Sequence, residues 1–336
     1  MPHQTTNQQT VDTSVKYGDW RDELFQNGYV VLKGVIPQAR CDHYVEKMFQ
    51  WLESFPYGFS RHDRSTWTEE HLPTHIKGGM YHRYRVQHER TGEEPHFLTH
   101  NAIASCSEPG VLDVFSKLWG TDKLLVSFDG INFTLPAGKP LPPTQPWPHI
   151  DQNPQREGMQ CVQGILNFAP NGPKDGGLLV MKGSTKLMPE FFREHSKVIG
   201  RQTWGPTDWF GFEGDELKWF EDRGCETIKV NADAGDVILW DSRTMHFNCV
   251  PTSQNIRSLV YACYTPASFA TTETLQKKAE LFDERVGTTH WPHDNVFKCS
   301  VEKMRPDEEA EGSSKRLFEE PIVTDQILKL AGKVPY

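Results

Sequence analysis

Two histidines and one aspartate stand in an order that could hold a metal ion. His149 and Asp151 are separated by one residue, and His246 follows far downstream. Two imidazoles and one carboxylate form the facial ligand set for divalent iron, which leaves other positions of the metal open for substrate and oxygen. Residues i and i+2 of an extended strand project from one face, so His149 and Asp151 could converge on one ion. These residue types indicate metal-dependent chemistry.

The pair His149 and Asp151 is weak evidence when it is taken alone. Among 14 histidines, about one His-x-Asp triplet is expected by chance, and a surface turn before Asn153 would explain it as well. His246 strengthens the case, because it follows a buried strand expected at residues 237–240 after the turn signal Gly235-Asp236. The order of all three residues therefore carries the hypothesis.

Arg257 adds a feature that a bare metal site does not need. It begins an apolar run at residues 257–264. A permanently charged arginine that points inward requires an anionic partner, and its planar guanidinium suits an organic carboxylate. The alternative is that Arg257 faces solvent at a strand edge.

The elements that must position these residues are mainly short strands. A strand is expected at 28–34, followed by a helix at 37–54 and a helix with Ser107 as N-cap, Pro109 in its first turn and Gly120 at its end. Further helices are expected after Thr271 and near 327–330. Strands with turn signals and no strand–helix alternation favour a β-sandwich or barrel. These strands are expected at residues 124–133, 161–168, 177–182, 227–230, 237–240 and 257–264.

We expect one domain over residues 1–336, mainly β with flanking helices. Its expected parts are a disordered tail (1–16), a helical N-terminal support and loop region (17–122), a β core (123–268) and a C-terminal helical segment (269–336). Long loops without regular structure are often lids or binding loops. Three segments resist assignment and are candidates for such loops: 61–101, 136–148 and 204–220.

Composition argues against several classes of partner. A net charge of -9 and a pI near 5.9 disfavour nucleic acid and anionic membranes, and the apolar runs are too short to span a bilayer. The seven cysteines include no Cys-x-x-Cys pair, which argues against a disulfide framework and a structural zinc site. The polar N-terminus lacks the apolar region of a signal peptide. We therefore expect a cytoplasmic protein with a small-molecule partner, and the oligomeric state stays open.

These motifs together resemble those of the Fe(II)/2-oxoglutarate-dependent oxygenases, specifically the phytanoyl-CoA dioxygenase-like group. The resemblance runs from about residue 28 to residue 264. It includes Gly176-Gly177-Leu178 leading to Gly183-Ser184, and ten residues between His246 and Arg257. Lys182 stands where the family usually has Pro, and Thr185 where it has His. Neither position is a metal ligand, so these departures affect the subgroup and not the chemistry.

The resemblance implies a double-stranded β-helix (jelly-roll, cupin-like) core with His149, Asp151 and His246 as ligands of Fe(II). It implies that Arg257 binds the distal carboxylate of the cosubstrate 2-oxoglutarate, and that Asn248 is a polar cosubstrate contact. The expected reaction consumes O2, oxidises a C–H bond of a small organic molecule such as a secondary metabolite, and releases succinate and CO2. Two weaker cosubstrate candidates, each equally explained as a structural polar residue, are Asn132 and Asn167.

The carboxylate at position 151 argues for hydroxylation, desaturation or cyclisation, because halogenation requires a vacated ligand position. The alternative is a non-oxidative cupin-type hydrolase or isomerase in which zinc or manganese uses the same three ligands. Such an enzyme has no need for Arg257. A binding protein with a vestigial site is a third possibility, which the presence of all three ligands disfavours.

The substrate side is less defined. Trp147, Trp209 and Phe210 could wall a pocket for an apolar or aromatic substrate, although packing of the loop onto the barrel explains them equally well. A carboxylate substrate could be anchored by His82, Arg83 and Arg85. A coenzyme A thioester would require phosphate-binding basic residues, which the sequence does not identify.

Overall fold

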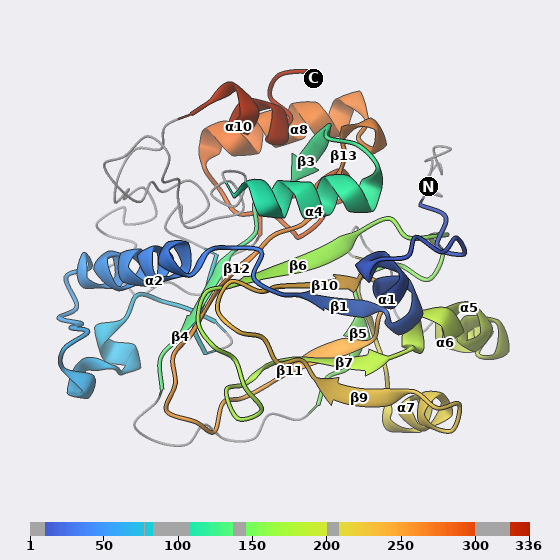
Figure 1. Cartoon of the computed structure of the whole chain (residues 1–336), viewed down its shortest axis with the longest axis horizontal. Helices are drawn as coiled ribbons and strands as arrows, with labels where there is room; N and C mark the ends of the chain where they lie inside the picture. The colour runs from blue at the N-terminus through green and yellow to red at the C-terminus, as the bar shows by residue number, and fades with distance from the viewer. Residues whose placement is uncertain (1–10, 77, 83–107, 137–145, 200–207, 300–322) are drawn as a thin grey trace.

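Two antiparallel sheets form the centre of the computed structural model, which describes residues 11–76, 78–82, 108–136, 146–199, 208–299 and 323–336 (Figure 1). The larger sheet has the order β1 (Tyr29–Leu32), β10 (Val237–Asp241), β6 (Val162–Asn167), β12 (Arg257–Tyr261), β4 (Ile131–Thr134) and β2 (Met80–Tyr81). The second sheet has the order β8 (Phe210–Gly211), β5 (His149–Ile150), β11 (His246–Cys249), β7 (Gly177–Lys182) and β9 (Glu226–Lys229). A short sheet pairs β13 (Tyr264–Pro266) with β3 (Leu124–Val126). The fold is a double-stranded β-helix, as expected.

Side-chain alternation places apolar groups on both faces of the larger sheet. Ile165 and Ile238 lie in the cluster between the two sheets together with Leu178 of β7, whereas their neighbours Leu166 and Leu239 belong to the cluster that packs against the helices. Because both faces are covered, every residue of β6 and β10 is buried. This explains why these strands appear in the sequence as nearly continuous apolar runs.

Helices cover the outer face of each sheet. The cluster beside the larger sheet includes residues of α1 (Trp20–Asn27), α2 (Gln38–Glu53), α4 (Pro109–Trp119), α8 (Thr272–Glu284) and α10 (Asp325–Leu330). Figure 1 shows α4, α8 and α10 gathered around β3 and β13. On the second sheet, Met181 packs with Phe191 of α5 (Ser184–Glu194) and Phe220 of α7 (Gly214–Glu221). The described residues also form the short helical turns α6 (Ser196–Ile199), η1 (Arg64–Thr66), η2 (Glu69–His71) and η3 (Ala267–Phe269).

The expected Gly235-Asp236 turn has a clear physical basis. Gly235 has φ +89°, and a Cβ there would lie 2.2 Å from the carbonyl oxygen of Ile36, so no other residue fits. The Asp236 carboxylate accepts hydrogen bonds from the backbone N–H of Gly34 at 3.0 Å and of Asp233 at 2.6 Å. The turn thus ties β1 to β10, the strand that precedes His246.

Several boundaries differ from expectation. The runs 124–133 and 257–264 each divide into two strands, because in each run the chain crosses between the small sheet and the larger one. The N-cap of α4 is Glu108, and residues 1–10 of the expected tail lie outside the described ranges, as does Ser107. Segment 204–220 was wrongly expected to lack regular structure, since it contributes β8 and most of α7. Among the helices described, none is both long and apolar enough to cross a bilayer.

Candidate metal centre

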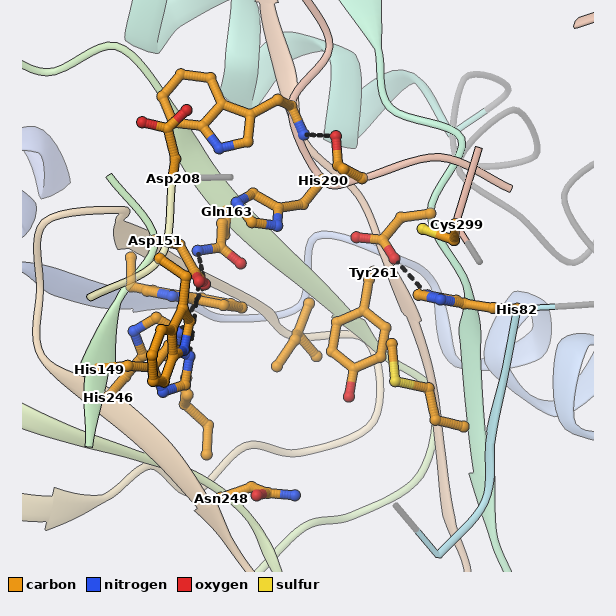
Figure 2. A pocket seen from close by; sticks show the side chains of 18 of the residues that line it. His82, His149, Asp151, Gln163, Asp208, His246, Asn248, Tyr261, His290 and Cys299 are labelled. Atoms are coloured by element: carbon orange, nitrogen blue, oxygen red, sulfur yellow. Dashed lines mark hydrogen bonds and ion pairs between the residues drawn. The ribbon is translucent and has the colours of Figure 1, made fainter. Parts of the chain in front are cut away.

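The second sheet brings the three expected ligands together. His246 on β11 pairs directly with His149 on β5, and Asp151 follows β5 in the chain. Each residue offers one ligand atom, and these three atoms all lie within 4.8 Å of one another. Nε2 of His246 is 3.1 Å from Oδ2 of Asp151, and Nε2 of His149 is 3.7 Å from Oδ1. Figure 2 shows the three side chains converging on one wall of a pocket.

Backbone carbonyls fix the orientation of both imidazoles. Nδ1 of His149 donates to the carbonyl of Trp147 at 3.0 Å, and Nδ1 of His246 donates to the carbonyl of Thr244 at 2.9 Å. A carbonyl only accepts, so each Nδ1 carries the proton and each Nε2 keeps a lone pair directed at the centre. Metal-binding histidines are usually held in this way. The donor set therefore fits a divalent iron bound on one face.

Asp151 is held as a carboxylate. Its Oδ2 accepts a hydrogen bond from Nε2 of Gln163 at 2.9 Å, and its backbone N–H donates to the carbonyl of Ser242 at 2.8 Å. Burial acts to raise the pKa of Asp151, but the imidazoles of His149, His290 and His246 outweigh it and hold that pKa well below its usual range. The site consequently offers one negative charge to a cation.

The three ligands and Arg257 line one cavity of about 400 Å³. Arg257 is 9% exposed, and no carboxylate in the described part of the chain forms an ion pair with its guanidinium. The guanidinium of Arg257 lies against Gly177, where an added Cβ would be 3.0 Å from its Nε. Burial lowers the pKa of Lys229 to about 8, and the charge of Arg257 contributes to that shift. Two neighbouring cations favour an anionic ligand here.

The other expected site residues divide into two groups. Trp147, Trp209 and Asn248 line the cavity, and Nε1 of Trp147 donates to Oδ1 of Asn248 at 3.1 Å. Phe210 does not line the cavity, because it is buried against α5 and α7. The remaining candidates outside the cavity are Asn132, whose Oδ1 accepts from Thr134, and Asn167, whose amide donates to the backbone carbonyls of Ala169 and Asp233.

Of the three residues expected to anchor a carboxylate substrate, only His82 lies in the described part of the chain, and it is paired with a carboxylate of the protein. His82 lines the cavity, and its Nε2 is 2.8 Å from Oδ1 of Asp129. The imidazole therefore has a carboxylate partner from the protein itself. Arg83 and Arg85 lie outside the described residues.

Sequence analysis missed two polar residues beside the centre. Gln163 contacts Asp151 from β6, and the available signal was a glutamine inside a buried apolar run. His290 comes from the segment after α8 and lies near Gln163 and Asp151 in the pocket (Figure 2). That segment has no periodic pattern that would have revealed it.

Comparison with known proteins was consistent with this geometry. The family model described as phytanoyl-CoA dioxygenase (PhyH) matches residues 24–257. "Ava biosynthesis cluster protein O" of Aspergillus versicolor is 45% identical over 279 residues, which cover 82% of this chain and 87% of the relative. A "putative phytanoyl-CoA dioxygenase" of Dictyostelium discoideum is 22% identical and covers 73% of this chain and 75% of the relative. Among solved structures, the epimerase SnoN in complex with Fe3+, alpha ketoglutarate and nogalamycin RO matches with a TM-score of 0.49 and 16% identity, over 73% of this chain and 82% of the other.

Proposed function

Since this chain belongs to the phytanoyl-CoA dioxygenase family, we propose that it uses Fe(II), 2-oxoglutarate and O2 to oxidise a C–H bond of a small organic molecule. The outcome is hydroxylation, desaturation or cyclisation, with release of succinate and CO2. The observation that carries this proposal is the buried guanidinium of Arg257, which shares the cavity with the ligand triad. A dicarboxylate can bind the metal with one end and Arg257 with the other.

His149, Asp151 and His246 would hold the iron, which supplies oxygen activation when it is bound together with the 2-oxo acid. The carbonyls of Trp147 and Thr244 keep both histidines in the correct tautomer. Arg257 orients the cosubstrate through its distal carboxylate, and Asn248 and Lys229 stand nearby. A metal held by the three ligands would supply oxygen activation, and the cavity beside them would receive the substrate.

Charges in the pocket support an uncharged substrate over a coenzyme A thioester. His82 is paired with Asp129, and Asp208 is paired with Arg156. Within the described ranges, Arg257 is then the only cavity-lining arginine or lysine, and the cosubstrate would use it. The likeness to "Ava biosynthesis cluster protein O" supports a biosynthetic substrate, that is, a secondary metabolite.

The free cysteines in the described residues support a reducing, cytoplasmic setting.

The alternative, a zinc or manganese hydrolase or isomerase, uses the same triad but leaves Arg257 without a role. Succinate formation from 2-oxoglutarate separates the two. The purified protein with Fe(II) should form succinate even without substrate, at a slow rate, and His149→Ala should abolish this activity. Arg257→Ala should raise the KM for 2-oxoglutarate, whereas Arg223→Ala, which removes a guanidinium that follows α7 and packs over Trp219, should not. If Arg257→Ala leaves the 2-oxoglutarate dependence unchanged, the cosubstrate assignment is wrong.

A further inference from the structure

We propose that His290 is a substrate-binding residue of this pocket, and that the substrate is an uncharged aromatic molecule with a hydrogen-bonding group, such as a carbonyl or hydroxyl, that reaches His290. The inference rests on the proposed function, because it assumes that the cavity beside the metal receives the substrate. It assigns a chemical class to that substrate and a residue that recognises it.

Within the described residues, Nε2 of His290 has no hydrogen-bond partner. The imidazole lines the same cavity as the metal ligands, and Figure 2 shows it beside Gln163 and Asp151. Its Nε2 is shielded from solvent. Buried polar groups are nearly always hydrogen-bonded, so this ring, which lines the cavity and is itself only partly buried, has hydrogen-bonding capacity that the described residues do not use. Gln163, in contrast, is already engaged with Asp151.

The segment that carries His290, residues 288–294, forms a wall of the cavity that is fixed in place. Arg156 holds it, since the guanidinium donates to Asp294 at 2.8 Å and lies 4.8 Å from the ring centroid of Trp291. The backbone N–H of Thr288 donates to the carbonyl of Phe128 at 2.7 Å. His290 is therefore presented to the cavity by a preorganised backbone, which is what selective binding requires.

This wall lies outside the part of the chain that the family shares. The family model ends at residue 257, and the wall begins at Thr288. The proposed iron ligands and Arg257 all lie within residues 24–257. A segment beyond it that still lines the cavity is suited to distinguish one substrate from another, because the common chemistry does not constrain it.

The rest of the cavity surface indicates the substrate's character. Its charged side chains other than Arg257 and Asp151 are paired within the protein, as His82 is with Asp129 and Asp208 with Arg156. A flat apolar molecule can stack on these rings, and His290 supplies a polar contact that fixes its orientation. The rings that line the cavity are those of Trp147, Trp209, Trp240, Phe247, Tyr261, Trp291 and Phe297.

Two bicyclic probes of similar shape test this inference, namely quinolin-2-one, which carries an amide, and naphthalene, which does not. Their affinities are measured by ligand-observed NMR on the full chain loaded with Ni(II) and 2-oxoglutarate, so that no turnover occurs. The wild type should bind quinolin-2-one about tenfold more tightly than naphthalene, the value of one hydrogen bond. His290→Phe should remove this preference while naphthalene still binds, and His290→Gln should keep part of it. His195→Phe, at the end of α5, is the matched control and should keep all of it.

Three results would overturn the inference: equal binding of both probes by the wild type, an unchanged preference in His290→Phe, or a loss of 2-oxoglutarate affinity in that variant larger than its loss of quinolin-2-one affinity. The last result would place His290 in the cosubstrate site. Succinate formation by the Fe(II) protein is measured in parallel. If succinate forms normally and the probe preference is absent, only this inference fails; if no succinate forms, the proposed function fails, whatever the probes show.

Discussion

The indole of Trp147 lies flat against the imidazole of His149, with ring centroids 4.4 Å apart and ring planes inclined by 7°. The carbonyl of Trp147 also accepts the Nδ1 proton of His149, and its indole N–H donates to Asn248 on β11. One residue therefore holds a proposed metal ligand through its backbone and its ring, and links that residue to the neighbouring strand.

Replacement of Trp147 by leucine should weaken metal binding by about tenfold, the lower end of the effect expected when a group that orients a metal ligand is lost. The carbonyl contact survives in Trp147→Leu, but the stacked ring and the Asn248 hydrogen bond do not, so His149 gains rotational freedom. Competition with a chromogenic Fe(II) chelator measures the affinity.

Trp209→Leu is the matched control. Trp209 also lies near His149, at 5.9 Å between centroids, but it is 41% exposed and its ring is tilted by 30°. Its removal should change Fe(II) affinity little. Equal losses in both variants would show that general damage to the pocket, and not the stacking on His149, sets the affinity.

The candidate metal centre was predictable because its signals are local or ordered along the chain. His149 and Asp151 lie two residues apart at the end of a short strand, and His246 opens the strand paired with it. The helix α7 was also within reach, since Glu213 and Glu216 form a capping box that went unnoticed. Signals of this kind come from residue types and their order along the chain, and do not require the tertiary structure.

The pocket wall was not predictable on the same basis. Trp209 and Phe210 look alike in sequence, yet one faces the cavity and the other is buried against α5 and α7. Asp129 meets His82, and Arg156 meets Asp208, across long stretches of chain. Only the packing of separate segments decides such contacts, and no periodicity records them.

Gly177→Ala should weaken 2-oxoglutarate binding by about tenfold or more. A Cβ at this position would lie 3.0 Å from Nε and 3.2 Å from Cζ of Arg257, so the guanidinium must move away from its place, and an arginine–carboxylate contact depends on geometry. The KM for 2-oxoglutarate in the succinate assay measures the effect, and Fe(II) affinity should stay the same.

Gly183→Ala separates this effect from backbone strain. Both glycines have positive φ, +101° and +85°, so both substitutions are strained, but the nearest atom to a Cβ at Gly183 is Sγ of Cys225 at 3.8 Å. Gly183→Ala should reduce stability while the KM for 2-oxoglutarate stays near that of the wild type. An equal rise of KM in the two variants would rule out the contact with Arg257 as the cause.

The pair formed by His82 and Asp129 should make stability depend on pH. Burial acts to lower the pKa of His82, but the carboxylate of Asp129 and the sulfur of Cys299 outweigh it and raise that pKa from 6.5 to about 9. The contribution to the free energy of unfolding is therefore complete below pH 6.5, declines between pH 6.5 and 9, and is lost above that range.

Asp129→Asn should accordingly lower the free energy of unfolding at pH 6 by at most about 3 kcal/mol, and the difference from the wild type should shrink at pH 9.5. Urea unfolding at the two pH values measures it. Asp215→Asn, an exposed carboxylate in the first turn of α7, is the control and should give a small difference at both. A difference for Asp129→Asn that grows towards pH 9.5 would show that the imidazolium is not what Asp129 stabilises.

Arg156→Met should be strongly destabilising, because it leaves the buried carboxylate of Asp208 without its cation. The side chain of Asp208 is 3% exposed, and Arg156 donates to it at 2.7 Å and 2.9 Å while also binding Asp294. Removal of one partner from a buried pair costs about 3–5 kcal/mol. Guanidinium unfolding measures the loss. The double variant Arg156→Met with Asp208→Asn should recover part of it, since the unpaired charge is then removed as well.

Lys218→Met provides the matched comparison, because Lys218 forms an ion pair with Asp222 at 2.8 Å in which both side chains are exposed. Such a pair contributes less than about 1 kcal/mol. The stability loss in Arg156→Met should therefore exceed that in Lys218→Met several-fold. Arg156→Lys keeps the charge but not the planar fork, so it should fall between the two. Similar losses for Arg156→Met and Lys218→Met would mean that Asp208 and Asp294 find other partners, and that Arg156 does not hold the wall that carries His290.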